Sequence, residues 1–339
     1  MKKITLGFSI LALAGAVTVG CKKTNPTAPV ADTEVQTAKD ASWAFYSFTD
    51  AEQIAAFISD NTLNPTFYLP AAGSLGTTTP VQDTTSSNIS FGFNTTTCLD
   101  GRYREGSVQV DRLIDPNYNP HANPNSKYYR MYGYSERLTF SLYKIDGWQM
   151  TQVDKNGNYG QPILVVNNMS DANWNPAKTN LSWTIKGSFK LQKDNDSMQC
   201  NLDIVKTLVN TSVTTVFDPS KSKSINWSKA IVSYSGKITG YTSHNVPFTM
   251  NITPDQALTR DFTCAPNVVG SVSAPGTTLT TTSSQYHPFI GGIATFTTGT
   301  AYPRQIFYAG SEASLTPPCD NSGAILIKGI YYPVDFRLQ

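Results

Sequence analysis

The sequence is poor in the residues on which most hydrolytic sites depend. Its three histidines, His121, His244 and His287, lie far apart, and none has a second histidine at the spacing of a metal-binding pair. No Gly-x-Ser-x-Gly motif is present, so the sharp turn that exposes a nucleophilic serine in α/β-hydrolases is not encoded. No motif supports catalysis, and we predict that the protein is not an enzyme.

Glutamate is scarce as well. Glycosidases normally need two facing carboxylates, and the chain offers few glutamates, namely Glu34, Glu52, Glu105, Glu136 and Glu312. Aspartate is more frequent but lies mostly in turn sequences, where its side chain bonds its own backbone. A hydrolase that uses an Asp/Glu pair is therefore the second alternative to the main hypothesis below.

An excess of charge of one sign is also lacking. The chain carries 26 basic and 24 acidic residues, and removal of Lys2 and Lys3 with an N-terminal signal would make the two numbers equal. A protein that binds phosphate backbones normally shows a basic excess or a basic cluster. We therefore predict that nucleic acid is not a partner.

One segment has some features of a metal site. Residues 154–160, DKNGNYG, place oxygen ligands at alternate positions, as the start of a calcium loop does. The glycine comes one place late, and Val165 stands where the closing glutamate is needed. A hairpin turn explains the same residues, so we predict no metal and no cofactor.

The N-terminal segment has the pattern of a bacterial export signal. Lys2 and Lys3 precede the apolar run 4–19, which ends at Gly20-Cys21. A cysteine after a small residue predicts cleavage before Cys21 and acylation of its thiol, by palmitate among other chains. A retained transmembrane helix is the alternative, because the run is close to the roughly 20 residues that span a bilayer. Several acyl chains, at about 0.8 kcal/mol per buried methylene, would hold the protein on a membrane.

These features predict three regions. Residues 1–20 form a lipoprotein signal peptide. Residues 21–40 are polar, contain two prolines and show no apolar period, so we predict a flexible tether. Residues 41–339 form one β-rich globular domain, in which no internal linker is visible.

A short helix is predicted at the start of this domain. Thr49 and Glu52 have the spacing of a capping box, in which each side chain satisfies a backbone donor of the other residue. Apolar residues follow at helical spacing between Ile54 and Ile58, and Asn61 and Pro65 end the pattern.

The rest of the chain alternates apolar and polar residues in short runs. We predict strands at 138–144, 148–153 and 161–166, joined by Asp-Gly and Asn-Gly turns into a three-stranded meander. A second hairpin, 229–234 with 237–241, is predicted about Ser235-Gly236.

A third hairpin, 324–328 with 330–338, is predicted about Gly329. On the order of a dozen to sixteen strands follow from such signals. The predicted fold is all-β, a mainly antiparallel meander that forms a sandwich, an open barrel or an extended curved sheet.

The remaining cysteines are Cys98, Cys200, Cys264 and Cys319. An exported compartment permits disulfides, and the wide spacing excludes a zinc knuckle of the Cys-x-x-Cys type. A Cys264–Cys319 disulfide is the first candidate, because both residues flank the last strands. Buried free thiols are the alternative.

Two short motifs carry a resemblance to a family. CLDGRYREG at 98–106 resembles the C-x-D-G-R-x-R-x-G opening of uncharacterised lipoproteins of the Bacteroidota, and Cys319-Asp320-Asn321 before a hairpin resembles their C-D-N ending. The resemblance covers residues 90–339 and departs from the pattern at 308–318. It implies a fold and a lipid anchor in the outer membrane, and it leaves the periplasmic face and the cell surface both open.

Aromatic side chains gather in two places, Tyr331 with Tyr332 and Phe336, and a larger group of Tyr128, Tyr129, Tyr132, Tyr134 and Trp148. Tyrosine and tryptophan present a flat apolar face with a polar rim, which suits sugars, peptides or lipid tails. Ordinary core packing in strands is the alternative. The main hypothesis is a membrane-anchored protein that binds a glycan, a peptide or an envelope protein. The first alternative is a carrier that holds a lipid or another apolar ligand in a curved sheet.

Overall fold

The computed structural model describes ten segments of the chain. From Glu34 onward they belong to one compact unit, Glu34–Gln339, and residues 1–33 form a separate unit. The described residues are 33–60, 88–98, 102–126, 128–170, 181–209, 227, 230–262, 289–299, 302–308 and 322–335.

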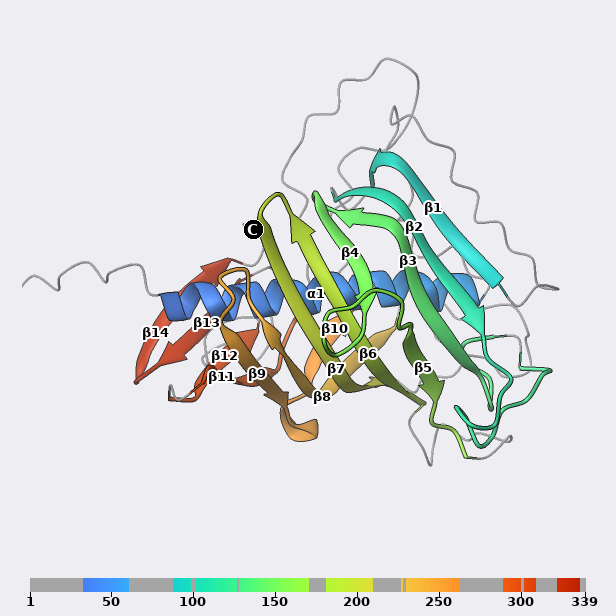
Figure 1. Cartoon of the computed structure of the whole chain (residues 1–339). Coiled ribbons are helices and arrows are strands. Elements are labelled where there is room, and N and C mark those ends of the chain that lie inside the picture. The colour runs from blue at the N-terminus through green and yellow to red at the C-terminus, as the bar shows by residue number, and fades with distance from the viewer. Residues whose placement is uncertain are drawn as a thin grey trace, which may run out of the picture. The chain divides into compact units, whose positions relative to one another are not determined.

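The described residues form one α-helix and a single 14-stranded sheet with antiparallel pairing throughout (Figure 1). This confirms the predicted all-β fold. A 3-10 turn, η3 (Pro254–Gln256), separates two of the strands. The elements are α1 (Thr33–Ser59), β1 (Asn88–Thr97), β2 (Tyr103–Arg112), β3 (Ser135–Ile145), β4 (Trp148–Val153), β5 (Ile163–Asn167), β6 (Ser182–Lys193), β7 (Asp196–Leu208), β8 (Ile231–Tyr241), β9 (Pro247–Ile252), β10 (Leu258–Asp261), β11 (Ile293–Thr297), β12 (Arg304–Tyr308), β13 (Ser322–Ile327) and β14 (Ile330–Asp335).

Strand order in the sheet follows chain order with two exceptions. The main path is β1-β2-β3-β4-β6-β7-β8-β9-β11-β12-β13-β14, with β10 paired to β8 and β5 paired to β3 and β6. The predicted three-stranded meander is wrong in this detail, because β5 does not follow β4 across the sheet. Instead β4 pairs with the end of β3 and β5 with its start, so both strands fill the same row between β3 and β6.

Two of the predicted hairpins are confirmed by their turn geometry. Asp146 and Gly147 take φ of 50° and 84° between β3 and β4, and Lys328 and Gly329 take 50° and 82° between β13 and β14. Positive φ at both central residues is what a two-residue hairpin turn requires.

The predicted hairpin about Ser235-Gly236 is wrong. β8 runs without interruption from Ile231 to Tyr241 and pairs with β7 along this length. Gly236 has a φ of 122°, and a Cβ there would lie 2.4 Å from the carbonyl oxygen of Asp203. The glycine therefore permits a close approach of two backbones inside the sheet and does not mark a turn.

The helix is longer than predicted and begins earlier. It has 27 residues, so residues 33–40 of the predicted tether are helical. The predicted capping box is also wrong, because Thr49 lies inside the helix and its Oγ1 donates to the carbonyl oxygen of Tyr46 at 2.9 Å. A helix that begins at Thr33 leaves no free backbone donor for Thr49 to cap.

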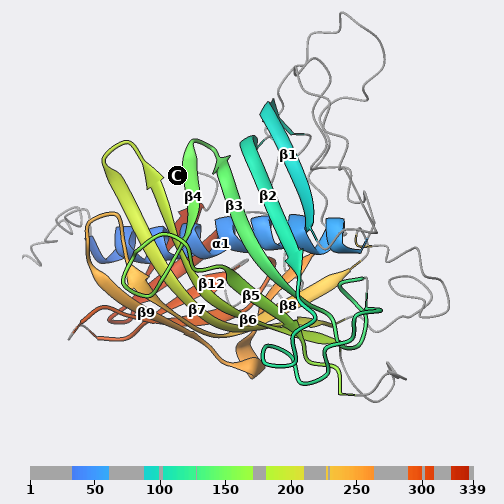
Figure 2. The same ribbon diagram turned by 45° about the vertical axis from the view of Figure 1, so that its right-hand side comes forward.

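The helix is buried on all sides. From Asp40 to Asp60 every residue is buried, and the sheet curves along it so that α1 lies on the concave side and crosses the strands (Figures 1 and 2). Rings of the helix pack on rings of the sheet, as Phe48 does on Phe189 with centroids 5.2 Å apart. A helix buried all round has no solvent-facing side, so the polar residues between Asp40 and Asp60 do not mark one. In the described part of the chain, no helix has both the length and the apolar character of a membrane span.

Candidate functional site

The carboxylates of α1 are buried and paired with cations of the sheet. Asp50 accepts a hydrogen bond from Arg104 of β2 at 2.8 Å and another from Arg260 of β10 at 3.4 Å. All three side chains are almost completely shielded from solvent. Burying such a group without its partner costs several kcal/mol, so the pairs hold the helix in one register against the strands.

A second pair lies next along the helix. Lys206 Nζ of β7 donates to both carboxylate oxygens of Glu52, at 3.0 and 2.9 Å, and to Gln53 Oε1 at 2.8 Å. The same ammonium lies 5.1 to 5.7 Å from the ring centres of Tyr129, Trp183 and Trp227. Burial lowers the pKa of Lys206, and Glu52 opposes that effect. Aromatic rings and one carboxylate together replace the water that the cation loses on folding.

A third group surrounds Glu136 of β3. Its Oε2 accepts hydrogen bonds from Ser59 Oγ at 2.8 Å and from Tyr134 OH at 2.6 Å, whereas its Oε1 has no hydrogen-bond partner. Burial raises the pKa of Glu136 to about 7, with a further contribution from the charge of Glu52. A raised carboxyl pKa is common in active sites but also arises in buried structural networks.

The chemistry open to this interior is limited by access. Among the described residues, no aspartate or glutamate lines the hollow described below, so none of the buried acids named above is brought to it. We interpret the interior network as the set of contacts that fixes α1 to the sheet.

The predicted aromatic group does not form an exposed platform. Tyr129 and Tyr134 are 0% and 1% exposed and belong to the core, where Tyr129 stacks on Trp183 with centroids 4.5 Å apart. Trp148 is also buried. The two half-buried members, Tyr128 and Tyr132, each contact a neighbouring side chain.

Arg130 lies 4.8 Å from the ring centre of Tyr128, and the hydroxyl of Tyr132 is hydrogen-bonded to His121 Nδ1 at 3.0 Å. The alternative of core packing therefore holds for Tyr129, Tyr134 and Trp148, which are too buried to be the binding aromatics for which they were candidates. High β-propensity and core packing explain their clustering in the sequence.

The outer face of the sheet changes character along a single row of paired residues. The row begins with charged and polar residues on β6 to β9 and ends with apolar and aromatic residues on β13 and β14. From β6 to β14 it contains Lys186, Asp203, Lys237, Asn251, Thr295, Gln305, Leu326 and Tyr331.

A neighbouring row on the last strands is apolar throughout. It pairs Ile293 with Phe307, Phe307 with Ala324, and Ala324 with Pro333. Phe307 and Tyr331 lie with ring centroids 5.7 Å apart, and 47% of Tyr331 is exposed. Outward apolar residues in adjacent rows form a patch, which in soluble proteins is associated with binding.

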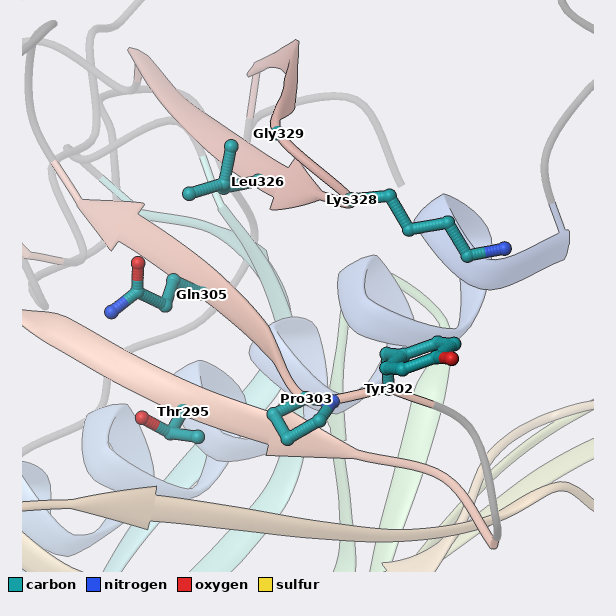
Figure 3. Close-up of a pocket in the computed structure, with 7 residues that line it drawn as sticks. All are labelled: Thr295, Tyr302, Pro303, Gln305, Leu326, Lys328 and Gly329. Carbon is teal, nitrogen blue, oxygen red and sulfur yellow. The ribbon is translucent and has the colours of Figure 1, made fainter.

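A hollow of about 660 Å³ lies at one end of this patch (Figure 3). Three residues of the long row form part of its lining, and the others come from the segment before β12 and from the β13–β14 turn. The lining consists of Thr295, Tyr302, Pro303, Gln305, Leu326, Lys328 and Gly329.

Tyr302 and Lys328 are the prominent side chains of the hollow. Tyr302 is 73% exposed, and Lys328 Nζ lies 5.9 Å from the centre of its ring (Figure 3). Among the described residues Lys328 forms no ion pair. The arrangement combines a flat aromatic face, an amide, a hydroxyl and one cation, which together can orient a polar ligand that has an apolar side.

None of the lining residues was predicted as a site residue from the sequence, and only the neighbouring Tyr331 was noted there, in the second aromatic group. Tyr302, Gln305 and Lys328 are separated in the sequence, and only the strand pairing brings them together. One sequence feature could have indicated this face. In β12 and β13 the outward positions include the apolar residues Phe307, Ala324 and Leu326, so both faces of these two strands carry apolar side chains.

Several predicted residues lie outside the described part of the chain or have a structural explanation. Cys21, Cys264 and Cys319 are not described, so the lipidation and the candidate disulfide stay predictions. Cys200 is a buried free thiol, and burial raises its pKa.

In the segment that resembles a calcium loop, Asp154 accepts hydrogen bonds from the side-chain amide of Asn158 at 3.0 Å and from the backbone N–H groups of Asn158 and Asn156, both at 2.8 Å, which lower the pKa of its carboxyl. These contacts are those of an Asx turn. The chain therefore does turn at these residues, and an isolated bridge between Val153 and Tyr159 closes the turn, but the turn does not join β4 to β5 as a hairpin.

Comparison with known proteins gives no relative from which a function could be transferred: no family model, no curated protein and no solved structure matches the chain.

Proposed function

We propose that the chain is a non-enzymatic lipoprotein of the cell envelope that binds a glycan, a peptide or a protein partner. Acylated Cys21 anchors it to the outer membrane, on the periplasmic face or at the cell surface, as in the Bacteroidota lipoproteins that its end motifs resemble. The outer face of β11 to β14 carries the binding site.

The observation that carries this proposal is the change of polarity along the long cross-strand row. Lys186, Asp203 and Lys237 are charged and paired side by side, as expected for a surface that stays in water. Leu326 and Tyr331 stand at the other end of the same row. Exposed apolar residues that are grouped, and not scattered, are associated with interaction sites.

The lipid-carrier alternative has less support. It needs an apolar groove on the concave side of the sheet, and in the described part of the chain that side is occupied by α1, whose residues from Asp40 to Asp60 are buried. The hydrolase alternative needs two acids that a substrate can reach. Glu52 and Glu136 are both fully buried and hydrogen-bonded to Lys206, Ser59 or tyrosine hydroxyls.

The anchor is tested with Cys21→Ala in the full chain. We expect the parent protein in the membrane fraction, with an acylated cysteine at the N-terminus of the mature protein by mass spectrometry. The variant should lose the acyl mass and leave the membrane fraction. A parent protein with residues 1–20 intact and no acyl group would contradict the anchor.

The binding face is tested by screening the purified protein against immobilised glycans, a peptide library and envelope proteins. Tyr302→Ala and Tyr331→Ala should each weaken the interaction found. The matched controls are Tyr159→Ala and Tyr241→Ala, because Tyr159 is 74% and Tyr241 47% exposed, close to the 73% and 47% of the two test residues. No binding to any class, or equal losses in test and control variants, would overturn the proposal.

A further inference from the structure

We propose that the hollow of Figure 3 binds an acidic saccharide, with a carboxylate of the sugar on Lys328 and a face of the ring on Tyr302. The inference rests on the proposed binding function and names its ligand class.

The size and the lining of the hollow suit one or two sugar rings. Its volume of about 660 Å³ falls within the range of roughly 300–1,000 Å³ that is typical of small-ligand sites. Tyr302 offers an exposed apolar ring face with a polar rim, which matches a sugar that is apolar on its C–H face and polar at its edge. Pro303 and Leu326 extend the apolar part of the lining.

The polar groups of the lining suit hydroxyls. Gln305 supplies a carbonyl oxygen and an NH₂ group, and Thr295 supplies a hydroxyl that both donates and accepts. The two residues are cross-strand partners on β12 and β11, so both side chains project from one position of the outer face. Vicinal hydroxyls of a sugar can donate to and accept from such a pair at once.

The charge of the hollow points to an anion. Among the described residues, Lys328 is the only charged residue of the lining, no carboxylate lines the hollow, and Lys328 forms no ion pair. The turn holds this lysine at a φ of 50°, beside Gly329. A single ammonium matches a monoanionic carboxylate, whereas phosphate recognition usually uses an arginine fork or several converging donors.

A peptide strand is a poorer occupant of this end of the sheet. Strand addition depends on backbone hydrogen bonds to an edge strand, and β14 pairs only with β13 among the described strands. It contains Pro333, which has no N–H group, and proline on an edge strand discourages pairing with another chain.

The test uses tetrasaccharides of galacturonate, mannuronate and glucuronate together with their neutral methyl esters. Titration calorimetry on the purified chain measures each acid against its own ester, so the two ligands differ in charge and otherwise share their shape. At least one acid should bind about five-fold more tightly than its ester, equivalent to about 1 kcal/mol, as expected for one exposed charge pair.

Variants separate the two contacts. Lys328→Gln should remove the preference for the acid and leave binding of the ester unchanged, whereas Tyr302→Ala should weaken both by ten-fold or more. Lys237→Gln and Tyr159→Ala remove an exposed lysine and an exposed tyrosine elsewhere on the surface and should change neither affinity. All four positions are exposed, so we expect each variant to give the circular dichroism spectrum of the parent protein.

The failure of this inference differs from that of the proposed function. If no acid binds, or if acid and ester bind equally, the acidic saccharide is wrong. A Tyr302-dependent peptide or protein ligand found in the screen would then keep the binding function while replacing its ligand class. If no ligand of any class responds to Tyr302→Ala, both proposals fall.

Discussion

Glu136 is expected to make the stability of the protein depend on pH in a direction opposite to that of most surface carboxylates. The pKa of its carboxyl is raised by burial from the ordinary value of 4.5 to about 7. A carboxyl with a higher pKa in the folded state retains its proton there while the unfolded chain loses it. The stabilisation is complete below about pH 4.5 and is lost as the pH rises through 7.

The magnitude follows from the size of the shift. One pKa unit corresponds to about 1.4 kcal/mol, so the shift of Glu136 corresponds to about 3 kcal/mol in total, of which about 2 to 3 kcal/mol is lost between pH 5 and pH 8. The groups that set the value are the buried environment, the hydroxyls of Tyr134 and Ser59, the negative charge of Glu52 and the positive charge of Lys206.

Glu136→Gln removes this titration and nearly preserves the shape of the side chain. Urea unfolding at pH 5 and pH 8 should show that the parent protein loses about 2 to 3 kcal/mol more than the variant between the two values. Asp60, whose pKa is also raised by burial, contributes equally to both proteins and cancels in the difference. In the Glu136→Gln variant the side-chain NH₂ would have no hydrogen-bond partner among the described residues near the position of Oε1. The free-energy cost of that unpaired group is the same at both pH values, so it cancels in the difference.

Glu105→Gln is the matched control, because Glu105 lies on the neighbouring strand β2 and its pKa is lowered by hydrogen bonds from Lys144 and Tyr103. Its stabilisation is present above the unfolded pKa and is lost as the pH falls, so it contributes almost no slope between pH 5 and pH 8. If the parent protein and Glu136→Gln lost the same free energy of unfolding over that range, the reasoning about the buried carboxyl would be refuted.

Two further substitutions test the interior and the sheet. Lys206→Met leaves the carboxylate of Glu52 buried without its cation and should lower the free energy of unfolding in urea by about 3–5 kcal/mol. The double variant Lys206→Met with Glu52→Gln should recover a large part of this loss. If the double variant were no more stable than Lys206→Met alone, the pairing of Lys206 with Glu52 would be contradicted. Gly236→Ala should lower the free energy of unfolding by more than about 1 kcal/mol, because its φ is 122° and the new Cβ would lie 2.4 Å from the carbonyl oxygen of Asp203. Gly92→Ala, where nothing lies within 4 Å of the new Cβ, should cost much less, and equal losses at the two glycines would rule out the steric explanation.

Local turn chemistry was the part of the fold that could be predicted from the sequence. Asp146, Gly147 and Gly329 take the positive φ that their residue types favour, Lys328 takes it beside Gly329, and the strands beside both turns form as expected. Gly236 shows the limit of this reasoning, because a glycine between two apolar runs has the same pattern whether the chain turns or two strands approach closely. Only the pairing of β7 with β8 distinguishes the two cases.

The helix and the binding face could not be predicted, for related reasons. Amphipathic periodicity identifies helices that have one solvent-facing side, and α1 has none from Asp40 onward, so helical spacing was recognised only between Ile54 and Ile58. Glu52 was predicted to cap the helix with Thr49, but it is paired with Lys206 inside the unit, as Asp50 is with Arg104. Long-range ion pairs of this kind leave no local signature in one sequence.

The strand β12 shows how the interior and the proposed binding face depend on each other. Its residues alternate, so that Tyr308 points inward and donates to Ser42 Oγ of α1 at 3.0 Å, while Gln305 belongs to the outer hollow. Because one short strand serves both sides, contacts with the helix determine where the outer side chains project. We therefore expect inward substitutions to change the fraction of folded protein and outward ones to change affinity per folded molecule.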